Sequence, residues 1–239
     1  MYINCIFVVH KKYQKTTKNI QGMYMIVVIG GVKGGTGKTT ISTNLAVLRS
    51  SNGKKVLLVD ADEQKSSSSF SSQRDALGIE TKWSTIQLGG KELHSQVKRL
   101  KPDYDDIIID VGGRQTTSQR SALLVADVYV LPFNPASYDI WTVGEVNTII
   151  RDMKTANPKL KALAFINRAD PRGSDNEESI GILEECKEFE CLKFTIGNRK
   201  TFRTSSGEGL SVMEVKNPDK KAIQEITDLY DYIYIKCMD

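Results

Sequence analysis

A glycine-rich segment, residues 30–40, lies between an apolar run and a stretch with helical periodicity. It contains a glycine, five further residues and then Gly-Lys-Thr, at Gly31, Gly37, Lys38 and Thr39. Glycines allow backbone N–H groups to turn inward around phosphate oxygens, and the following helix start adds the positive end of its dipole. A glycine turn that only packed would not require the lysine and the threonine. The segment therefore imposes the order strand, tight loop, helix, and it predicts a phosphate-binding loop, or P-loop.

Five apolar runs are predicted to form strands that are covered on both faces, as in parallel sheets. They are residues 24–29, 56–59, 107–109, 128–131 and 163–166. Between them lie segments long enough for crossover helices, and we predict helices over residues 39–50, 144–156 and 177–190. Alternating strands and helices predict an α/β fold with a doubly wound, mostly parallel sheet and helices on both faces. Ligands of such sheets bind at the carboxyl ends of the strands, where Asp60, Asp110 and Asn167 follow three of the runs.

The distribution of charge separates the first 22 residues from the rest of the chain. The 239 residues include 33 Lys and Arg and 29 Asp and Glu, a formal net charge of +4. Residues 1–22 contain four lysines and no acidic residue, so the remainder is formally neutral. We predict that residues 1–22 are a basic extension, disordered or upstream of the natural start, and that residues 23–239 form a single domain.

Other counts exclude several classes of protein. No apolar run approaches the roughly 20 residues of a membrane-spanning helix, which predicts a cytoplasmic protein. The four cysteines show no paired spacing of zinc or iron–sulfur type, and there are two histidines. Chemistry that depends on a histidine base or on histidine metal ligands is therefore not expected.

A second lysine, Lys33, precedes the P-loop lysine by five residues. With it, the string of residues 33–40 resembles the deviant Walker A box of the ParA/MinD family of P-loop ATPases. The resemblance covers residues 24–235 and includes further motifs in the same order: residues 59–62 after the second strand, 107–110 as a Walker B strand, 164–168 as an adenine-side strand, and a late loop region over 195–210. Within the family, the chain is most similar to small partition ATPases without an N-terminal helix-turn-helix domain.

The resemblance implies an ATPase that uses ATP and Mg²⁺ and forms a homodimer in its ATP state. It implies that Lys38 and Lys33 bind phosphates from the two subunits and that Thr39 ligates Mg²⁺. Asp62 would position the attacking water with support from Asp60, and Asp110 would hold the metal through water. Positioned charge of this kind is what phosphoryl transfer requires. The other implied nucleotide contacts are Gly34, Gly35, Thr36, Gly37, Thr40 and Asn167.

Two segments depart from the pattern of the family. Glu63-Gln64 follows Asp62 where many ParA proteins have a proline, and residues 111–114 (Val-Gly-Gly-Arg) follow Asp110 in place of a Thr-Pro or Thr-Ala-Gly type of loop. We expect these departures to affect how the loops respond to the γ-phosphate, and not the binding of the nucleotide.

DNA partition is the interpretation that the residues favour within this family. Related reductases need cysteines to hold a cluster, and residues 6–185 contain none. MinD-like proteins end in a basic amphipathic helix, whereas residues 222–239 contain one Lys against four acidic residues. Their apolar stripe is predicted to pack on the core. Tyr230, Tyr232 and Tyr234 resemble the tyrosine cluster of bacterial tyrosine kinases, which usually lack the lysine that Lys33 supplies.

A late basic segment is the predicted DNA-binding surface. Residues 191–221 hold seven basic against three acidic side chains, and sequence-independent DNA affinity is mainly phosphate neutralisation. The predicted contacts are Arg199, Lys200, Arg203, Lys216, Lys220 and Lys221. The resemblance implies a centromere-binding partner, ParB-like or a ribbon-helix-helix adaptor, that stimulates hydrolysis, and a nucleoid-associated protein. Two alternatives remain open: a MinD-like or cargo-positioning ATPase that acts on a membrane or protein surface, and a bacterial tyrosine kinase.

Overall fold

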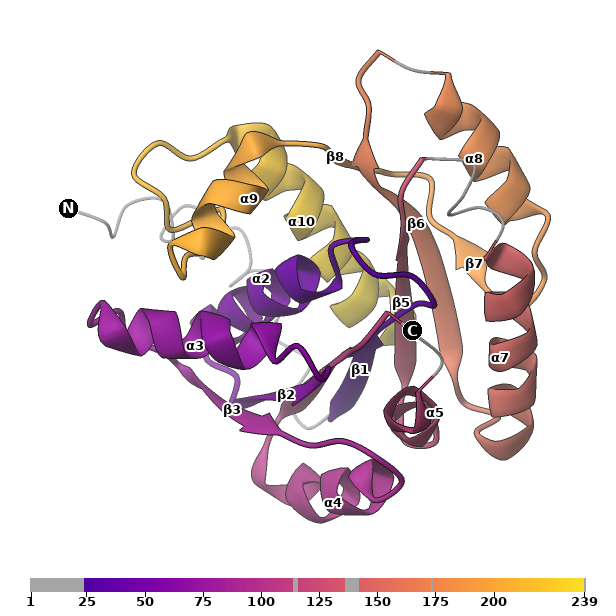
Figure 1. Cartoon of the computed structure of the whole chain (residues 1–239), viewed down its shortest axis with the longest axis horizontal. Helices are drawn as coiled ribbons and strands as arrows, with labels where there is room; N and C mark the ends of the chain where they lie inside the picture. Colours follow the sequence, from indigo (N-terminus) through magenta and orange to yellow (C-terminus); the bar gives the residue numbers. More distant parts are fainter. Residues whose placement is uncertain (1–23, 114–115, 136–141, 173, 239) are drawn as a thin grey trace.

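A parallel β-sheet forms the centre of the molecule (Figure 1). The computed structural model of the chain describes residues 24–113, 116–135, 142–172 and 174–238. Strands follow the order β3-β2-β4-β1-β5-β6-β7, β8 pairs with β6, and each of these pairings is parallel. Their bounds are β1 Met25–Ile29, β2 Val56–Ala61, β3 Trp83–Gln87, β4 Asp106–Val111, β5 Val128–Phe133, β6 Lys161–Ala169, β7 Glu190–Cys191 and β8 Ile196–Gly197.

Helices cover both faces of the sheet, because alternate side chains of a strand point to opposite faces. One face carries α2 (Lys38–Ser51), α3 (Ser66–Ala76), α9 (Lys200–Gly207) and α10 (Lys220–Tyr234). The other carries α4 (Leu93–Leu100), α5 (Thr117–Leu123), α7 (Val143–Ala156) and α8 (Asp175–Glu184). The strand residues divide accordingly: Val27 and Ile108 pack toward the first group of helices, and Val28 and Ile109 toward the second. The predicted doubly wound fold is confirmed.

Several predicted boundaries are corrected. The helix predicted over residues 177–190 ends at Glu184 in α8, because the chain returns to the sheet through buried Phe189 and forms β7. β5 continues through Pro132, because β1 has ended at Ile29 and the missing N–H therefore faces no strand partner. β6 continues past Asn167 to Ala169, with an irregular register and a left-handed φ of 56° at Arg168. A run of four serines, residues 66–69, forms the start of α3.

A buried polar cluster fixes α10 to the end of the sheet where β4 begins. Arg49, in the last turn of α2, donates from Nε to Asp106 (2.5 Å) and from Nη1 to the Tyr230 hydroxyl (3.1 Å). Asn52 donates to the same hydroxyl (3.0 Å), and the Arg49 guanidinium lies 4.3 Å from the centre of the Tyr234 ring. Burial raises the pKa of Asp106 although Arg49 opposes that shift. The predicted packing of the C-terminal segment on the core is confirmed.

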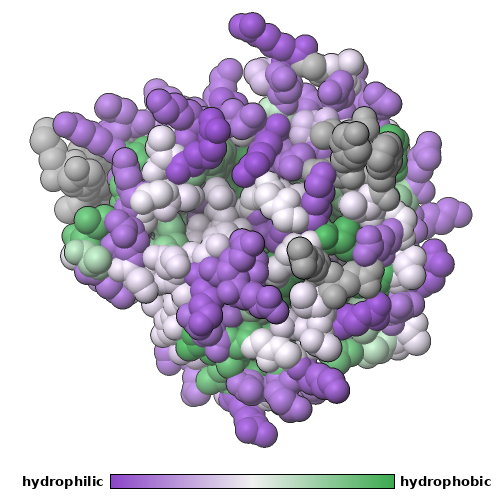
Figure 2. All heavy atoms as spheres, in the orientation of Figure 1, coloured by the Kyte–Doolittle hydropathy of each residue, from purple (hydrophilic) through white to green (hydrophobic). Residues whose placement is uncertain are grey.

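The helices and the visible surface can be compared with those of a membrane-spanning protein. None of the helices in the described ranges is both long and apolar enough to cross a lipid bilayer. In the face shown in Figure 2, hydrophilic side chains dominate and hydrophobic ones form only small, scattered groups. The predicted extension, residues 1–22, lies outside the described residues.

The cluster around Arg49 generates a prediction about stability. Tyr230→Phe removes a hydroxyl that accepts two hydrogen bonds, and it is expected to lower the free energy of unfolding by roughly 1–3 kcal/mol. Tyr234→Phe is the matched control, because in the described structure the buried Tyr234 hydroxyl has no hydrogen-bond partner. Urea denaturation should show little loss for this second variant. Equal losses for the two variants would contradict the assignment.

Candidate functional site

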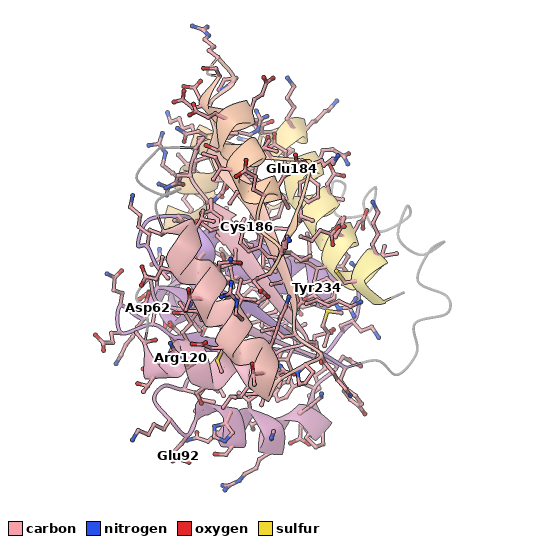
Figure 3. The ribbon with its side chains drawn as sticks, turned by 90° about the vertical axis from the view of Figure 1, so that its right-hand side faces the viewer. Asp62, Glu92, Arg120, Glu184, Cys186 and Tyr234 are labelled. Atoms are coloured by element: carbon pink, nitrogen blue, oxygen red, sulfur yellow. The ribbon has the colours of Figure 1, made fainter. Side chains whose placement is uncertain are left out.

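The carboxyl ends of three adjacent strands form the floor of a cavity of about 1030 Å³. Ile29 of β1 pairs with Asp110 of β4, which pairs with Asp60 of β2. The P-loop and the two carboxylates therefore leave the sheet at the same level. Asp62 lines the cavity just beyond β2, and Figure 3 shows it on the opposite side of the view from Tyr234. The cavity and the Arg49 cluster thus lie at opposite ends of the strands.

Hydrogen bonds within the P-loop, and one from β6, fix the conformation of its backbone. Lys38, 6% exposed, donates from Nζ to the Lys33 carbonyl (2.8 Å). The buried Asn167 side chain donates from Nδ2 to the Thr36 carbonyl (2.6 Å). Gly37 has a left-handed φ of 91°, and a Cβ there would lie 2.3 Å from Asn167 Nδ2. Glycine is thus required at position 37 both by its backbone conformation and by the close approach of Asn167.

Asp110 is a buried carboxylate with one shared and one unshared oxygen. Thr39 and Ser67 both donate their hydroxyls to Asp110 Oδ2, at 2.7 and 2.6 Å. Within the described structure Oδ1 is buried and has no hydrogen-bond partner. Burial raises the pKa of Asp110 to about 6, against the opposing effect of the two hydroxyls. A threonine oxygen beside a carboxylate with a spare oxygen is a donor set suited to a hydrated Mg²⁺ ion.

Asp60 organises the segment that follows β2. Its Oδ2 accepts the Ser68 N–H (2.7 Å), and its Oδ1 accepts the Asp62 N–H (3.3 Å). Asp60 is 2% exposed, whereas Asp62 is half-buried and faces the cavity. Asp60 thus orients the start of α3 and the backbone of Asp62, and leaves the Asp62 carboxylate accessible from the cavity.

The unusual loop after Asp110 packs directly on the P-loop. A Cβ at Gly113 would lie 2.5 Å from the Gly34 nitrogen and 2.6 Å from the Lys33 carbonyl oxygen. A Cβ at Gly112 would lie 3.3 Å from an Asp62 carboxylate oxygen. The two glycines therefore permit contacts that larger residues would prevent. Arg114, the last residue of the atypical segment, lies outside the described residues.

The structure places the predicted nucleotide-site residues in three groups. The cavity is lined by Gly34, Gly35, Gly37, Lys38, Thr39, Thr40, Asp60 and Asp62. Thr36, Asp110 and Asn167 are buried and support the loop or the strand ends. Lys33 is not among the lining residues, and its carbonyl binds Lys38.

Ser67, Lys65 and Arg168 were not among the predicted site residues, although all three lie at the cavity or contact a residue of the site. Ser67 lies inside a serine run and is distinguished only by its contact with Asp110. Lys65 and Arg168 both line the cavity and both have left-handed φ angles, 54° and 56°. Such angles are uncommon in residues other than glycine, and they are not visible in a sequence pattern.

The predicted DNA-binding residues do not share one environment. Arg199 donates two hydrogen bonds to Glu225 (2.9 and 2.6 Å) and lies 3.7 Å from Asp219. Its charge is therefore neutralised within the chain. The other five side chains are exposed on α9 and around the start of α10, which lie side by side (Figure 1): Lys200, Arg203, Lys216, Lys220 and Lys221.

The loop between α9 and α10 is anchored to the two helices that begin at the cavity. Arg74 of α3 binds Glu214 through two hydrogen bonds (2.7 and 2.9 Å) and donates to the Gly209 carbonyl (2.9 Å). Asn44 of α2 accepts the Val212 N–H (3.0 Å). The basic side chains that flank this loop are thus connected to the nucleotide site by specific contacts.

Asp110→Asn is expected to stabilise the nucleotide-free protein in a pH-dependent way. Because the pKa of Asp110 is raised from 3.8 to about 6, its contribution to stability is greatest below pH 4 and is lost as the pH rises through 6. An asparagine removes that loss, so the free energy of unfolding should rise by roughly 1–3 kcal/mol at pH 8 and by less at pH 5. Thermal unfolding at both pH values measures the difference. Asp103→Asn, at an exposed carboxylate, is the control, and equal gains at both pH values would contradict the prediction.

Known proteins resemble the chain in sequence. Residues 27–212 match the family described as CobQ/CobB/MinD/ParA nucleotide binding domain. The chain is 26% identical over 222 residues to the maintenance of carboxysome distribution protein A of Halothiobacillus neapolitanus. The aligned region covers 87% of this chain and 95% of that protein. It is 27% identical over 146 residues to protein IncC of Escherichia coli, and that aligned region covers 60% of this chain and 41% of IncC.

Solved structures share the fold. A plasmid partition protein of Borrelia burgdorferi B31 (BB_S35) bound to AMPPNP has a TM-score of 0.71 at 23% identity and covers 89% of this chain and 99% of its own. The septum site-determining protein MinD of Pyrococcus horikoshii OT3 with Mg-ADP has a TM-score of 0.68 at 23% identity and covers 90% and 97%. The sequence match runs from β1 to the loop before α10, and the chain therefore belongs to the CobQ/CobB/MinD/ParA family of nucleotide-binding domains.

Proposed function

We propose that the chain is an ATP-dependent partition ATPase of the ParA type. It binds Mg·ATP at the P-loop, forms a homodimer in that state and then binds DNA without sequence preference. A centromere-binding partner, ParB-like or a ribbon-helix-helix adaptor, stimulates hydrolysis to ADP and phosphate, and the DNA is released. The observation that carries the proposal is the single cavity in which the P-loop, Lys38, Asp60 and Asp62 meet.

The residues of the cavity suit phosphoryl transfer, which needs positioned charge more than covalent chemistry. The P-loop backbone and Lys38 supply positive charge for phosphate oxygens. Asp62 is the accessible carboxylate that can orient a water, and Asp60 fixes its backbone. Thr39 and Asp110 are the residues that would hold Mg²⁺, which supplies charge stabilisation for the phosphates when it is bound.

The exposed cations near α9 and α10 support the DNA-binding part of the proposal. Within residues 191–221, all of which the structure describes, Glu208 is the one acidic side chain that is fully exposed. Glu214 binds Arg74, and Asp219 caps α10 and lies beside Arg199. The five predicted contacts on α9 and around α10 are exposed, and so is Lys193 earlier in the segment, against one exposed carboxylate. This balance favours the attraction of phosphates. Arg199 contributes by holding the loop before α9 against Glu225.

A second candidate is the positioning of a protein cargo by the same ATP cycle. The similarity to a relative named for the maintenance of carboxysome distribution favours it. Co-sedimentation with a protein lattice or with liposomes, in the absence of ATP-dependent DNA affinity, would favour this candidate over partition. The tyrosine-kinase alternative is weakened, because two of its three tyrosines, Tyr230 and Tyr234, are each 1% exposed and cannot reach a phosphate donor in the folded chain. The third, Tyr232, is half-buried and donates its hydroxyl to Glu190.

Two variants in the cavity test the ATP cycle. Asp62→Ala should abolish hydrolysis and trap the ATP dimer, because the water loses its carboxylate while the phosphate contacts remain. Lys33→Ala should bind ATP yet fail to dimerise. Light scattering after size-exclusion chromatography and a gel shift on random-sequence duplex DNA measure the two effects. Asp75→Ala, an exposed carboxylate elsewhere on α3, is the control and should behave as wild type. If ATP produced neither a dimer nor DNA binding by Asp62→Ala, the proposal would fail.

A charge reversal tests the DNA surface separately. Lys200→Glu with Arg203→Glu should remove ATP-dependent DNA binding, and milder Ala substitutions should lower the salt dependence of the binding constant by about two contacts. Lys98→Glu with Arg99→Glu makes the same charge change at exposed positions of α4, on the opposite face of the sheet, and should leave binding intact. Equal losses for the two pairs would place the DNA elsewhere.

A further inference from the structure

Ser67 makes a buried contact that no motif of the site requires. Its side chain is 0% exposed, and its hydroxyl donates to Asp110 Oδ2 at 2.6 Å. Asp110 lies near the end of β4, and Ser67 lies in the first turn of α3, the helix that follows the neighbouring strand β2. The bond therefore joins α3 to β4. Within residues 66–69, Ser67 is thus the serine for which the structure gives a side-chain bond to a carboxylate of the site.

The neighbouring serines behave differently. Ser68 binds Asp60 through its backbone N–H, while its own hydroxyl is buried without a partner in the described structure. Ser69 donates its hydroxyl to the Lys65 carbonyl, within the first turn of the same helix, and is exposed. These three chemically identical residues therefore have different environments, and of the three only Ser67 donates its hydroxyl to the Asp110 carboxylate.

The two hydroxyls on Asp110 can act together. A hydroxyl that donates its proton keeps two oxygen lone pairs, so Thr39 can donate to Oδ2 and still offer its oxygen to a metal. The carboxylate is then held by two donors on one oxygen, and Oδ1 is the oxygen that remains available. Loss of the Ser67 donor would leave Thr39 alone to fix the orientation of the carboxylate.

We propose that Ser67 is a positioning residue for the Mg²⁺ site, and that its hydroxyl holds Asp110 so that Thr39 and Asp110 are presented together to the hydrated metal. The inference rests on the proposed function only in that the site takes Mg²⁺ with a nucleotide. It does not depend on dimerisation, on DNA binding or on a partner.

The test measures how Mg²⁺ affects the binding of ADP, a ligand whose binding requires no hydrolysis. Fluorescence of a labelled ADP is titrated with the full chain at a series of Mg²⁺ concentrations and in EDTA. Ser67→Ala should raise the Mg²⁺ concentration for half-maximal effect by about 10-fold or more, as expected for the loss of a group that orients a metal ligand. The affinity for ADP in EDTA should stay unchanged. Ser69→Ala, the same chemical change two residues further along α3 at an exposed side chain, should match wild type in both measurements.

The outcomes separate this inference from the proposed function. If the wild type bound no ADP, the nucleotide proposal itself would fail. If the wild type responded to Mg²⁺ and Ser67→Ala responded at the same concentration, the role of Ser67 would be wrong. A merely structural role would weaken ADP binding equally with and without Mg²⁺, and that result would also overturn the inference. Ser67→Cys, which keeps the size and a weak donor, should fall between wild type and Ser67→Ala and covers a failure of the alanine variant to fold.

Discussion

The parallel register of β1, β4 and β2 is the constraint on which the site depends. Ile29, Asp110 and Asp60 are paired directly across these strands. A slip of one residue would turn each carboxylate to the other face of the sheet, because strand side chains alternate. The continuous apolar strands thus fix the register, and the register sets the level at which the loop and the carboxylates meet. Every contact of Thr39, Ser67 and Ser68 with the strand ends follows from it.

β4 has a buried carboxylate near each end, and the two carboxylates have different hydrogen-bond partners. Asp106 has a guanidinium partner in Arg49, as a buried charge in a structural role normally does. Asp110, at the cavity end, has two hydroxyl donors and an oxygen without a partner in the described structure. Burial raises its pKa to about 6, because the hydrogen bonds from the two hydroxyls offset only part of the effect of burial. Each carboxylate keeps one buried oxygen without a partner in the described structure, so the difference between them is the guanidinium of Arg49. A buried carboxylate bound only by hydroxyls, beside a P-loop, is typical of a position reserved for a ligand.

The parts of the fold that the sequence predicts are those with an unbroken apolar signal. The central strands and the helices α2 and α7 were predictable on that ground. β3 was not, because it lies at the edge of the sheet and only Trp83 of its five residues is buried. The P-loop glycines and Asp60 could be placed by motif. The contact of Ser67 could not, since four adjacent serines give no local preference, and the neutralisation of Arg199 depends on Glu225, which lies 26 residues away in the chain.

The loop of residues 209–214 connects the basic side chains around α10 to the helices that begin at the phosphate cavity. Arg74 and Asn44, which hold this loop, belong to α3 and α2, and both helices begin at the phosphate cavity. The loop and the nucleotide site are therefore attached to the same two helices. Rigid helices transmit displacement along their length with little loss. A small rotation of α3 about its serine-rich start would therefore displace Arg74. Through the bonds of Arg74 to Gly209 and Glu214, the loop and the neighbouring Lys216 would move with it.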